Sequence, residues 1–561
     1  MSQIKEILAA KDNELEDMQR KEVKVGDEYS FMLTRLGGKY YATSGNCTHY
    51  GAPLVGAALA SDGRVMCKWH GACFNVKTGD VEDAPALDSL QTYEVKIRDG
   101  NVYVLVDDEK LSSSRRHPPC ARRSPQSSET VVIVGGGASG AAAAQKLREE
   151  GFQGRIRVVS REAYYPVDRI KITKQYGIES PDAITLRPKD FWDDLDIEFQ
   201  LDTDATSVDA QARKVKLSNG DEWQYDHLIL ASGGWPKTMG CPGENLQNIF
   251  TIRMVGNNTK ISQTLNTMKE QKGRQPRVVI VGSSFIGTEI ASAITQNKAA
   301  AVTIVSVDKL PLQKVLGDEI GKVLMRMHES KGVKFITEAQ VLGFEHDAND
   351  LTAVGSVTIK DRDPVPADLV IIAVGVRPQT DYLQDNSDLA LADDGSLVVD
   401  RYFRVVGSDN VYATGDIATF PYQHTGEQLR VEHWGFAENT GRLVAMNIAK
   451  GSLARPFSHV PYFWTAQFGT TLRYAGFAKS FDDVLIQGNT SDLENLYFVG
   501  YFSKNDEVLA ICSYMKDPYV SYCAELLRLG KMPKASEISN GLDPMSIPLI
   551  VPEEEELQAR M

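Results

Sequence analysis

Four residues near the N-terminus have the side chains and the spacing of a metal site. Cys47 and His49 are separated by one residue, and 17 residues later Cys67 and His70 are separated by two. Structural zinc usually takes its cysteines from one short loop and its histidines from another. Here each loop supplies one Cys and one His, which suits a [2Fe–2S] cluster with thiolates on one iron and imidazoles on the other. We therefore expect an iron–sulfur cluster, with zinc as the less favoured alternative.

The stretch CTHYGAPLVGAALASDGRVMCKWHGACF resembles the Rieske motif C-x-H-x(15–17)-C-x2-H at all four ligand positions. High-potential members of that family add two bridging cysteines, and Ser and Tyr hydroxyls that donate to the cluster sulfurs. The matching positions here are Ala52, Trp69, Ala72 and Phe74, which can do neither. Fewer hydrogen bonds to the sulfurs stabilise the reduced cluster less, so the resemblance implies a potential near the low end, about −150 mV.

A Rieske cluster could instead serve an oxygenase site within the same chain. Such a site needs a mononuclear iron held by two histidines and a carboxylate. The other histidines show no D/E-x2-H-x4-H grouping; they are His117, His227, His328, His346, His424, His433 and His459. An oxygenase site in this chain is therefore not favoured.

Two glycine-rich turns each follow an apolar strand and precede an Ala-rich helix. In VVIVGGGASGAAAAQKL, from residue 131, Gly135, Gly137 and Gly140 satisfy G-x-G-x-x-G. Such glycines allow the tight turn, the approach of a pyrophosphate and the close packing of helix on strand. Glu162 ends the next strand, where it could accept a hydrogen bond from a ribose hydroxyl. This pattern predicts a dinucleotide site.

The second turn, RVVIVGSSFIGTEIASAITQN from residue 277, departs from the pattern. Gly282 and Gly287 are present, but Ser284 stands at the middle glycine position. The following strand, VTIVSVDKL, has no acidic residue at its usual place and no Arg cluster for a 2′-phosphate. We expect a second nucleotide site here, with NADH favoured over NADPH.

Four further segments resemble flavoprotein reductases with two dinucleotide-binding domains, in which an NAD domain interrupts the FAD domain. They are YYPVDRIKITK, LILASGGWP, IIAVGVRPQT and NVYATGDIATF. The resemblance implies that the first turn and Glu162 bind the adenosine half of FAD, and that the second turn binds NAD(P)H. It also implies flavin contacts from Arg169, Lys174, Asp416, Glu432, Trp434 and Trp464.

The same resemblance gives Glu289 a role, because it matches a family glutamate that pairs with the lysine beside the flavin, here Lys174. A lysine near the reactive flavin nitrogen stabilises anionic reduced flavin, and a buried carboxylate needs such a partner. We expect Lys174 and Glu289 to be the catalytic pair.

The remaining cysteines bear on which acceptor the flavin could reduce. Cys120, Cys241, Cys512 and Cys523 form no C-x2-C or C-x4-C pair, so reduction of a disulfide is not favoured. The phrases CTHYGAPL, KWHGACFN, VPYFWTAQFGTTLRYAGFA and FDDVLIQG resemble the Rieske-containing branch of the apoptosis-inducing-factor family. The resemblance implies NADH-driven electron transfer through FAD and the cluster to an unknown acceptor, a protein or a small molecule. The alternative is an NADH-sensing signalling protein with incidental turnover.

The expected fold is a multidomain α/β architecture with an all-β Rieske domain, FAD and NAD Rossmann-like domains and a C-terminal α+β domain. Length alone, 561 residues, indicates several domains. We expect a Rieske domain (1–110), a flexible Ser/Pro/Arg-rich linker (111–128), an FAD domain (129–250 and 381–455), an NAD(P)H domain (251–380) and a C-terminal domain (456–561).

Composition limits the partners and the compartment. A formal net charge of −14 disfavours a nucleic-acid partner, because polyanion binding needs concentrated Lys and Arg. No apolar run reaches the length of a membrane span. Seven cysteines fit a reducing compartment, and the N-terminal stretch is neither a secretion signal nor a mitochondrial presequence by pattern. We expect a cytoplasmic protein, although the family resemblance leaves a mitochondrial location open.

Overall fold

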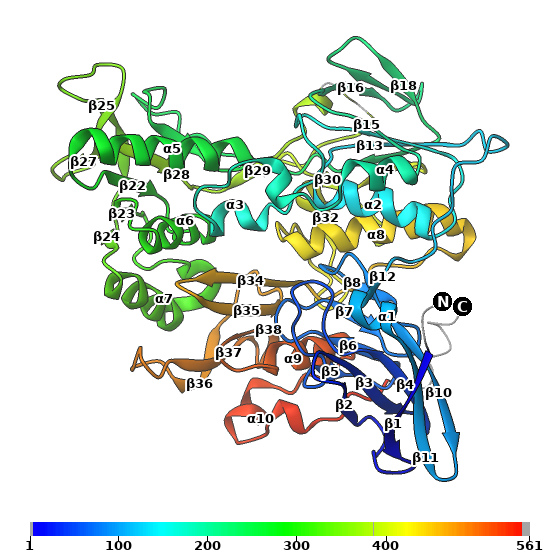
Figure 1. Ribbon diagram of the computed structural model, residues 1–561. Helices are drawn as coiled ribbons and strands as arrows, with labels where there is room; N and C mark the ends of the chain where they lie inside the picture. Colours follow the sequence, from blue (N-terminus) through cyan, green and yellow to red (C-terminus); the bar gives the residue numbers. More distant parts are fainter. Residues whose placement is uncertain (1–3, 385, 387, 552–561) are drawn as a thin grey trace.

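The computed structural model describes residues 4–384, 386 and 388–551. In Figure 1 the N-terminal domain lies beside the C-terminal domain, and helix α8 (Trp434–Lys450) runs along the FAD domain above both. The NAD domain occupies the opposite end of the molecule. As expected, the N-terminal domain is all-β and is followed by two parallel α/β domains and a C-terminal α+β domain.

The N-terminal domain contains a six-stranded antiparallel sheet and a small sheet that carries the ligand loops. The order of the large sheet is β1 (Ile4–Lys11), β11 (Asn101–Asp107), β10 (Thr92–Arg98), β4 (Lys39–Ser44), β3 (Tyr29–Leu36), β2 (Arg20–Val25). The order of the small sheet is β5 (Ala58–Leu59), β6 (Arg64–Met66), β7 (Cys73–Asn75), β8 (Val81–Asp83). One ligand loop follows β4, and the other joins β6 to β7.

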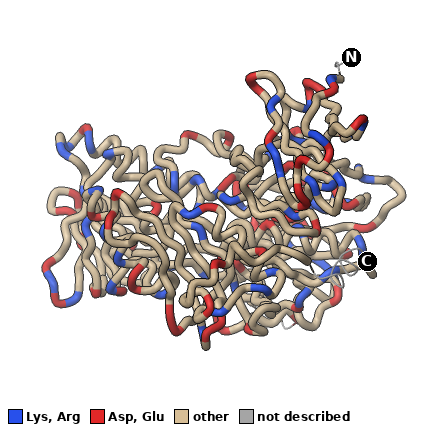
Figure 2. Tube along the Cα trace, turned by 90° about the horizontal axis from the view of Figure 1, so that it is seen from below, with Lys and Arg blue, Asp and Glu red and all other residues tan. Residues whose placement is uncertain are grey.

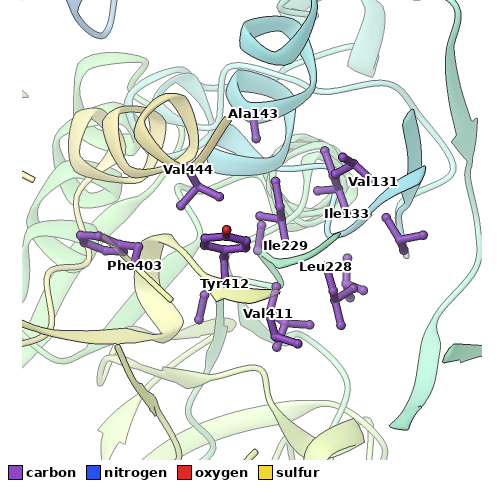
Figure 3. Packing of buried hydrophobic residues seen from close by; sticks show 14 of the residues in the cluster. Val131, Ile133, Ala143, Leu228, Ile229, Phe403, Val411, Tyr412 and Val444 are labelled. Atoms are coloured by element: carbon purple, nitrogen blue, oxygen red, sulfur yellow. The ribbon is translucent and has the colours of Figure 1, made fainter. Parts of the chain in front are cut away.

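The FAD domain is built on a five-stranded parallel sheet. Its order is β15 (Ile197–Gln200), β14 (Arg155–Val159), β13 (Thr130–Val134), β19 (His227–Leu230), β31 (Val411–Ala413). Helix α2 (Ala138–Glu149) packs along α8, and α3 (Ile170–Lys174) leads towards the NAD domain. Figure 3 shows Ile133 and Ile229 of the sheet on the side of Ala143 in α2 and Val444 in α8, while Leu228 and Val411 lie on the opposite side. Burial on both faces explains why these strands are continuous apolar runs.

The NAD domain repeats this design with a second parallel sheet. Its order is β21 (Ile249–Thr251), β28 (Leu369–Ile372), β22 (Arg277–Val281), β23 (Ala301–Val305), β24 (Lys334–Ile336). The helices that cover it are α5 (Val255–Lys272), α6 (Phe285–Gln296) and α7 (Gln313–Ser330). The Gly-rich turn at 282–287 joins β22 to α6, so the nucleotide turn lies at the carboxyl edge of the sheet, where ligands of open α/β sheets bind.

The C-terminal domain is an antiparallel sheet with helices. The strand order is β34 (Tyr462–Gln467), β35 (Thr470–Gly476), β38 (Glu507–Tyr514), β37 (Tyr497–Lys504), β36 (Asp483–Asn489). The helices are α9 (Tyr519–Arg528) and α10 (Ala535–Ser539). One apolar core joins this sheet and α9 to residues of the N-terminal domain, namely Ala58, Ala60, Met66 and Cys73. The Rieske domain is therefore packed against the C-terminal domain in this structure.

The segment 111–128, expected to be a flexible linker, is held on both sides. It begins within α1 (Asp108–Ser113), and β12 (Arg115–Arg116) then pairs with β9 (Ser89–Leu90). Further along, the Ala121 amide donates to the Arg148 carbonyl at 2.8 Å. The sequence of segment 111–128 has no apolar periodicity, but its backbone is held by hydrogen bonds to the N-terminal domain and to the FAD domain. The domain boundaries given above remain a proposal.

Basic and acidic residues are interspersed along the whole chain trace, as Figure 2 shows from below. Mixed charges of this kind favour solubility and do not create a large field of one sign. No helix in the described part of the chain is both long enough and apolar enough to cross a membrane.

Candidate cluster and flavin sites

The two ligand loops have the same backbone design. The Cys47 amide donates to the Ala52 carbonyl and the Cys67 amide to the Ala72 carbonyl, each at 2.8 Å. Each loop closes on a glycine with positive φ, +78° at Gly51 and +76° at the corresponding Gly71, a conformation that favours glycine. The glycine that follows each Cys/His pair is therefore required by the turn.

The loops bring the four side chains together as two like pairs. The Nδ1 atoms of His49 and His70 are 3.1 Å apart. Cys47 and Cys67 are buried and hydrogen-bonded to each other, which raises the pKa of Cys47 and lowers that of Cys67. Burial lowers the pKa of His49 to about 4 and also lowers that of His70, so both imidazoles are neutral at pH 7 and can act as ligands.

This arrangement fits a two-iron cluster and not a single zinc ion. Within the described residues, no three His, Cys, Asp or Glu side chains converge on one ion position. A tetrahedral zinc site would need four donors around one point, whereas each iron of a Rieske cluster takes only two donors from the protein. The four predicted ligands are brought together as predicted.

The histidine edge of this site faces the reductase and is enclosed by aromatic rings. The ring of Trp464, in β34, lies 4.4 Å from that of His70 and 5.9 Å from that of His49. On another side, Tyr50 stacks on His49 at 3.9 Å, and its hydroxyl donates to Asp168 at 2.7 Å. The cluster site thus lies at a junction of the N-terminal, FAD and C-terminal domains.

The first Gly-rich turn lines a cavity at the carboxyl end of the FAD-domain sheet. Most of the residues predicted for FAD line it: Gly135, Gly137, Glu162, Arg169, Asp416, Glu432 and Trp434. Gly140 lies behind the wall, where an added Cβ would be 1.9 Å from the Gly135 carbonyl oxygen. Only glycine allows α2 to approach the strand this closely, so the third glycine has the packing role that the motif predicts.

Polar groups of the cavity wall are held by neighbours. Glu162 accepts from the Tyr164 hydroxyl at 2.8 Å and forms an ion pair with Arg169. Asp416 accepts from the Gly234 amide at 3.1 Å. Burial raises the pKa of Glu432, and neighbouring Arg430 opposes this shift. The cavity, its glycine turn and these polar groups fit the phosphates and hydroxyls of FAD; the contact of each residue with the flavin remains a prediction.

Lys174 and Glu289 form the predicted pair, with Nζ and Oε1 2.9 Å apart. Thr465 also donates to Glu289 at 2.8 Å, and this threonine follows Trp464 directly in β34. The pair therefore joins α3, α6 and β34, which belong to three domains. Neither Lys174 nor Trp464 lines the cavity described above, and the ring of Trp464 contacts the histidines of the cluster site. Their contacts with the flavin stay a prediction.

The structure gives a reason for the serine at position 284, in the Gly-rich turn of the NAD domain. Ser284 is the N-cap of α6: its hydroxyl accepts from the Gly287 amide at 3.3 Å and donates to the Ala373 carbonyl at 2.9 Å. A serine is favoured at an N-cap for this reason. At Gly282 (φ +106°) an added Cβ would be 2.5 Å from the Ala373 carbonyl oxygen, so this glycine is required.

Several residues at the junction had no signal in the sequence. Asp168 and Tyr50 are 118 residues apart, and Arg473, which donates to the Trp69 carbonyl at 2.9 Å, is 404 residues from its partner. Glu438, on α8, is also buried at this junction. No short motif links such positions, because domain packing alone brings them together.

Comparison with known proteins agrees with this geometry. Residues 129–441 match the model of the pyridine nucleotide-disulphide oxidoreductase family, and residues 5–94 match the Rieske [2Fe-2S] domain. The chain belongs to the pyridine nucleotide-disulphide oxidoreductases and carries a Rieske domain. It is therefore an NAD(P)H-dependent oxidoreductase, with FAD and a [2Fe–2S] cluster as its redox groups.

Relatives of this oxidoreductase cover different shares of it. Apoptosis-inducing factor 3 of Homo sapiens is 38% identical over 94% of this chain and 84% of its own length. Rhodocoxin reductase of Rhodococcus erythropolis is 30% identical over 61% of this chain and 77% of its own length. The structure of a ferredoxin reductase from Rhodopseudomonas palustris, 25% identical, covers 74% of this chain and 99% of its own, with a TM-score of 0.68. A complex of putidaredoxin reductase with putidaredoxin shares the fold at 24% identity over 77% of this chain and 99% of its own, with a TM-score of 0.67.

Proposed function

We propose that this oxidoreductase passes electrons from NADH, by way of FAD, to its own Rieske cluster and from there to a separate one-electron acceptor. The observation that carries the proposal is the position of Trp464 and Thr465. Trp464 contacts the ring of His70, while Thr465, the next residue, bonds to Glu289 of the pair with Lys174. The cluster site and the expected flavin site are thus joined by two consecutive residues of one strand.

The resident groups supply the redox chemistry: FAD accepts a hydride as two electrons, and a [2Fe–2S] cluster exchanges one electron at a time. Cys47, His49, Cys67 and His70 would hold the cluster. Gly135, Gly137, Glu162 and Asp416 would bind FAD, and the turn at 282–287 would bind NADH at the amino end of α6.

Lys174 and Glu289 have a positioning task in this proposal. Glu289 is 5% exposed and accepts hydrogen bonds from Thr173 and Thr465, so its carboxylate is fixed in place. The carboxylate in turn holds the ammonium of Lys174, which could stabilise negative charge on a reduced flavin. The ring of Trp464 covers part of the histidine edge, which limits the access of solvent to it.

Two further inferences concern the nucleotide and the compartment. Ser306 follows β23, and its hydroxyl lies 2.8 Å from that of Ser283, so this position offers a small polar group to a ribose and no cation to a 2′-phosphate. We therefore infer a preference for NADH. All seven cysteines are unpaired, which supports a reducing compartment such as the cytoplasm.

The signalling alternative is not favoured. Among the relatives, rhodocoxin reductase and rubredoxin–NAD(+) reductase are named for the reduction of small electron carriers. The Rieske domain of this chain would supply such an electron acceptor within the same protein.

The test compares acceptors in a Cys47→Ser variant, because a serine hydroxyl is a poor ligand for iron–sulfur iron. We expect the variant to lose its cluster iron and sulfide, to keep reducing ferricyanide with NADH, and to stop reducing a cytochrome. Cys241→Ser, a change remote from the site, should leave both activities unchanged. Equal loss toward both acceptors in Cys47→Ser would contradict the order flavin, then cluster.

A further inference from the structure

A chain of buried hydrogen bonds leads from helix α7 to Glu289. Gln467, at the end of β34, is 3% exposed, and its side-chain oxygen lies 2.7 Å from Nε2 of His328 in α7. Its amide nitrogen donates to the Thr465 hydroxyl at 3.0 Å and to the Thr288 hydroxyl at 2.9 Å. The Thr465 hydroxyl donates to Glu289 at 2.8 Å. Gln467 therefore contacts both the NAD domain and the threonine that bonds to Glu289.

The direction of each hydrogen bond in this chain follows from the groups involved. An amide oxygen only accepts, so His328 donates from Nε2. Burial lowers the pKa of this histidine to about 4, so its ring is neutral at pH 7. The Thr288 hydroxyl donates within its own helix, so it accepts from Gln467. The Thr465 hydroxyl also accepts from Gln467, which leaves its single proton for Glu289.

The end of β34 is held firmly against helix α6. A buried amide without partners is unfavourable, whereas a network in which every group is bonded holds its members in one arrangement. The backbone is fixed as well, because the Phe468 amide donates to the Ser292 hydroxyl of α6 at 2.8 Å. Thr465 and Gln467 are two residues apart in a strand, so their side chains lie on the same face. Side chain and backbone thus set the position of Thr465 relative to α6, the helix that carries Glu289.

The chain of hydrogen bonds ends at the pair expected beside the flavin. Glu289 holds the ammonium of Lys174 at 2.9 Å. Hydride transfer takes two electrons and a proton from NADH, which leaves as NAD⁺, and adds one negative charge to the flavin, where a nearby ammonium stabilises it. A displaced Lys174 would stabilise that charge less. Both the rate of flavin reduction and the flavin potential therefore depend on how firmly Glu289 is held.

We propose that Gln467 is a positioning residue for the reduction of the flavin by NADH. Its amide orients the Thr465 hydroxyl toward Glu289, and the Glu289 carboxylate then keeps the ammonium of Lys174 in place. His328 fixes the orientation of the Gln467 amide by donating to its oxygen. The inference rests on the proposed function, because the contact of Lys174 with the flavin belongs to that proposal.

The test measures flavin reduction by NADH in stopped flow, together with the two-electron midpoint potential of the flavin. We expect Gln467→Met, which keeps a similar volume and has no donor, to lower the rate constant of flavin reduction about tenfold and to leave the dissociation constant of NADH nearly unchanged. A tenfold loss in stabilisation of the reduced flavin lowers this potential by about 30 mV. Gln487→Met, the same change at an exposed position in β36, should behave as the wild type. An unchanged rate constant and potential in Gln467→Met would overturn the proposal.

A second variant separates positioning from a general structural effect. Thr465→Val removes the hydroxyl that donates to Glu289 and should cause the same two losses, which also serves if Gln467→Met does not assemble. Because Gln467 acts through Thr465, the double variant should resemble Thr465→Val alone in rate constant and potential. Losses that add in free energy would show that the two residues act independently and would overturn the proposal, as would a wild-type potential in Thr465→Val.

The same titrations distinguish this inference from the proposed function. A wild-type protein whose flavin is reduced by NADH while its cluster stays oxidised would refute the order of electron transfer and leave the role of Gln467 standing. Normal reduction of both groups in the wild type, with no change in Gln467→Met and Thr465→Val, would refute the role of Gln467 alone.

Discussion

The Lys174–Glu289 pair gives the sharpest energetic prediction. Its atoms are 2.9 Å apart, and the side chains are 18% and 6% exposed. At an effective dielectric constant of about 20, the direct attraction at 2.9 Å is about 6 kcal/mol before the cost of removing both charges from water. Because that cost offsets much of the attraction, removal of a single partner from such a pair is expected to destabilise by about 3–5 kcal/mol, and joint removal by much less.

The assay is a double-mutant cycle with Glu289→Gln, Lys174→Met and the double variant. The free energy of unfolding is measured in urea on the flavin-loaded protein, with flavin fluorescence as a probe of this region. We expect each single variant to lose about 3–5 kcal/mol and the double variant to lose less than the sum, because neither charge is then buried without its partner. Additive losses, with a coupling below about 0.5 kcal/mol, would refute the interpretation that the two charges hold each other at the flavin.

Two more predictions concern the nucleotide sites. Gly140→Ala should lower the flavin content of the purified protein and reduce its free energy of unfolding by at least about 1–3 kcal/mol, because the new Cβ would lie 1.9 Å from the Gly135 carbonyl oxygen. Gly256→Ala is the control, because a Cβ added at Gly256 has no atom within 4 Å. Equal flavin content in the two variants would contradict the packing role of Gly140. Steady-state kinetics should give at least a tenfold higher kcat/KM for NADH than for NADPH, since the residue that follows β23 is Ser306 and not an arginine. An equal or reversed ratio would show that another residue binds the ribose.

The cluster ligands and the nucleotide turns could be predicted from the sequence because their chemistry is local. Each Cys/His pair lies within four residues, and the G-x-G-x-x-G spacing reports the close approach of a helix to its own strand. Ser284 departs from the glycine motif, and the structure shows that this serine caps α6. The local pattern predicted a nucleotide turn here but did not explain why a serine stands in it.

The packing of the domains could not be predicted in this way. The segment 111–128 has the composition of a free linker, yet backbone pairing of β12 with β9 holds it. The resemblance predicted a flavin contact for Trp464 but gave no sign that the Rieske domain brings His70 to its ring. Asp168 and Glu438 gain their surroundings only when the Rieske domain packs against α3 and α8. Contacts of this kind depend on the whole fold, and no spacing in the sequence records them.

The central claim is that NADH reduces a flavin and then a [2Fe–2S] cluster inside one chain. It is tested most directly by titrating the anaerobic, purified protein with NADH while absorption and low-temperature EPR spectra are recorded. We predict bleaching of the flavin absorption together with the EPR signal of a reduced Rieske centre, and two irons and two sulfides per chain. A protein that contains zinc at Cys47, His49, Cys67 and His70, or a flavin that NADH reduces while the cluster stays oxidised, would contradict the account.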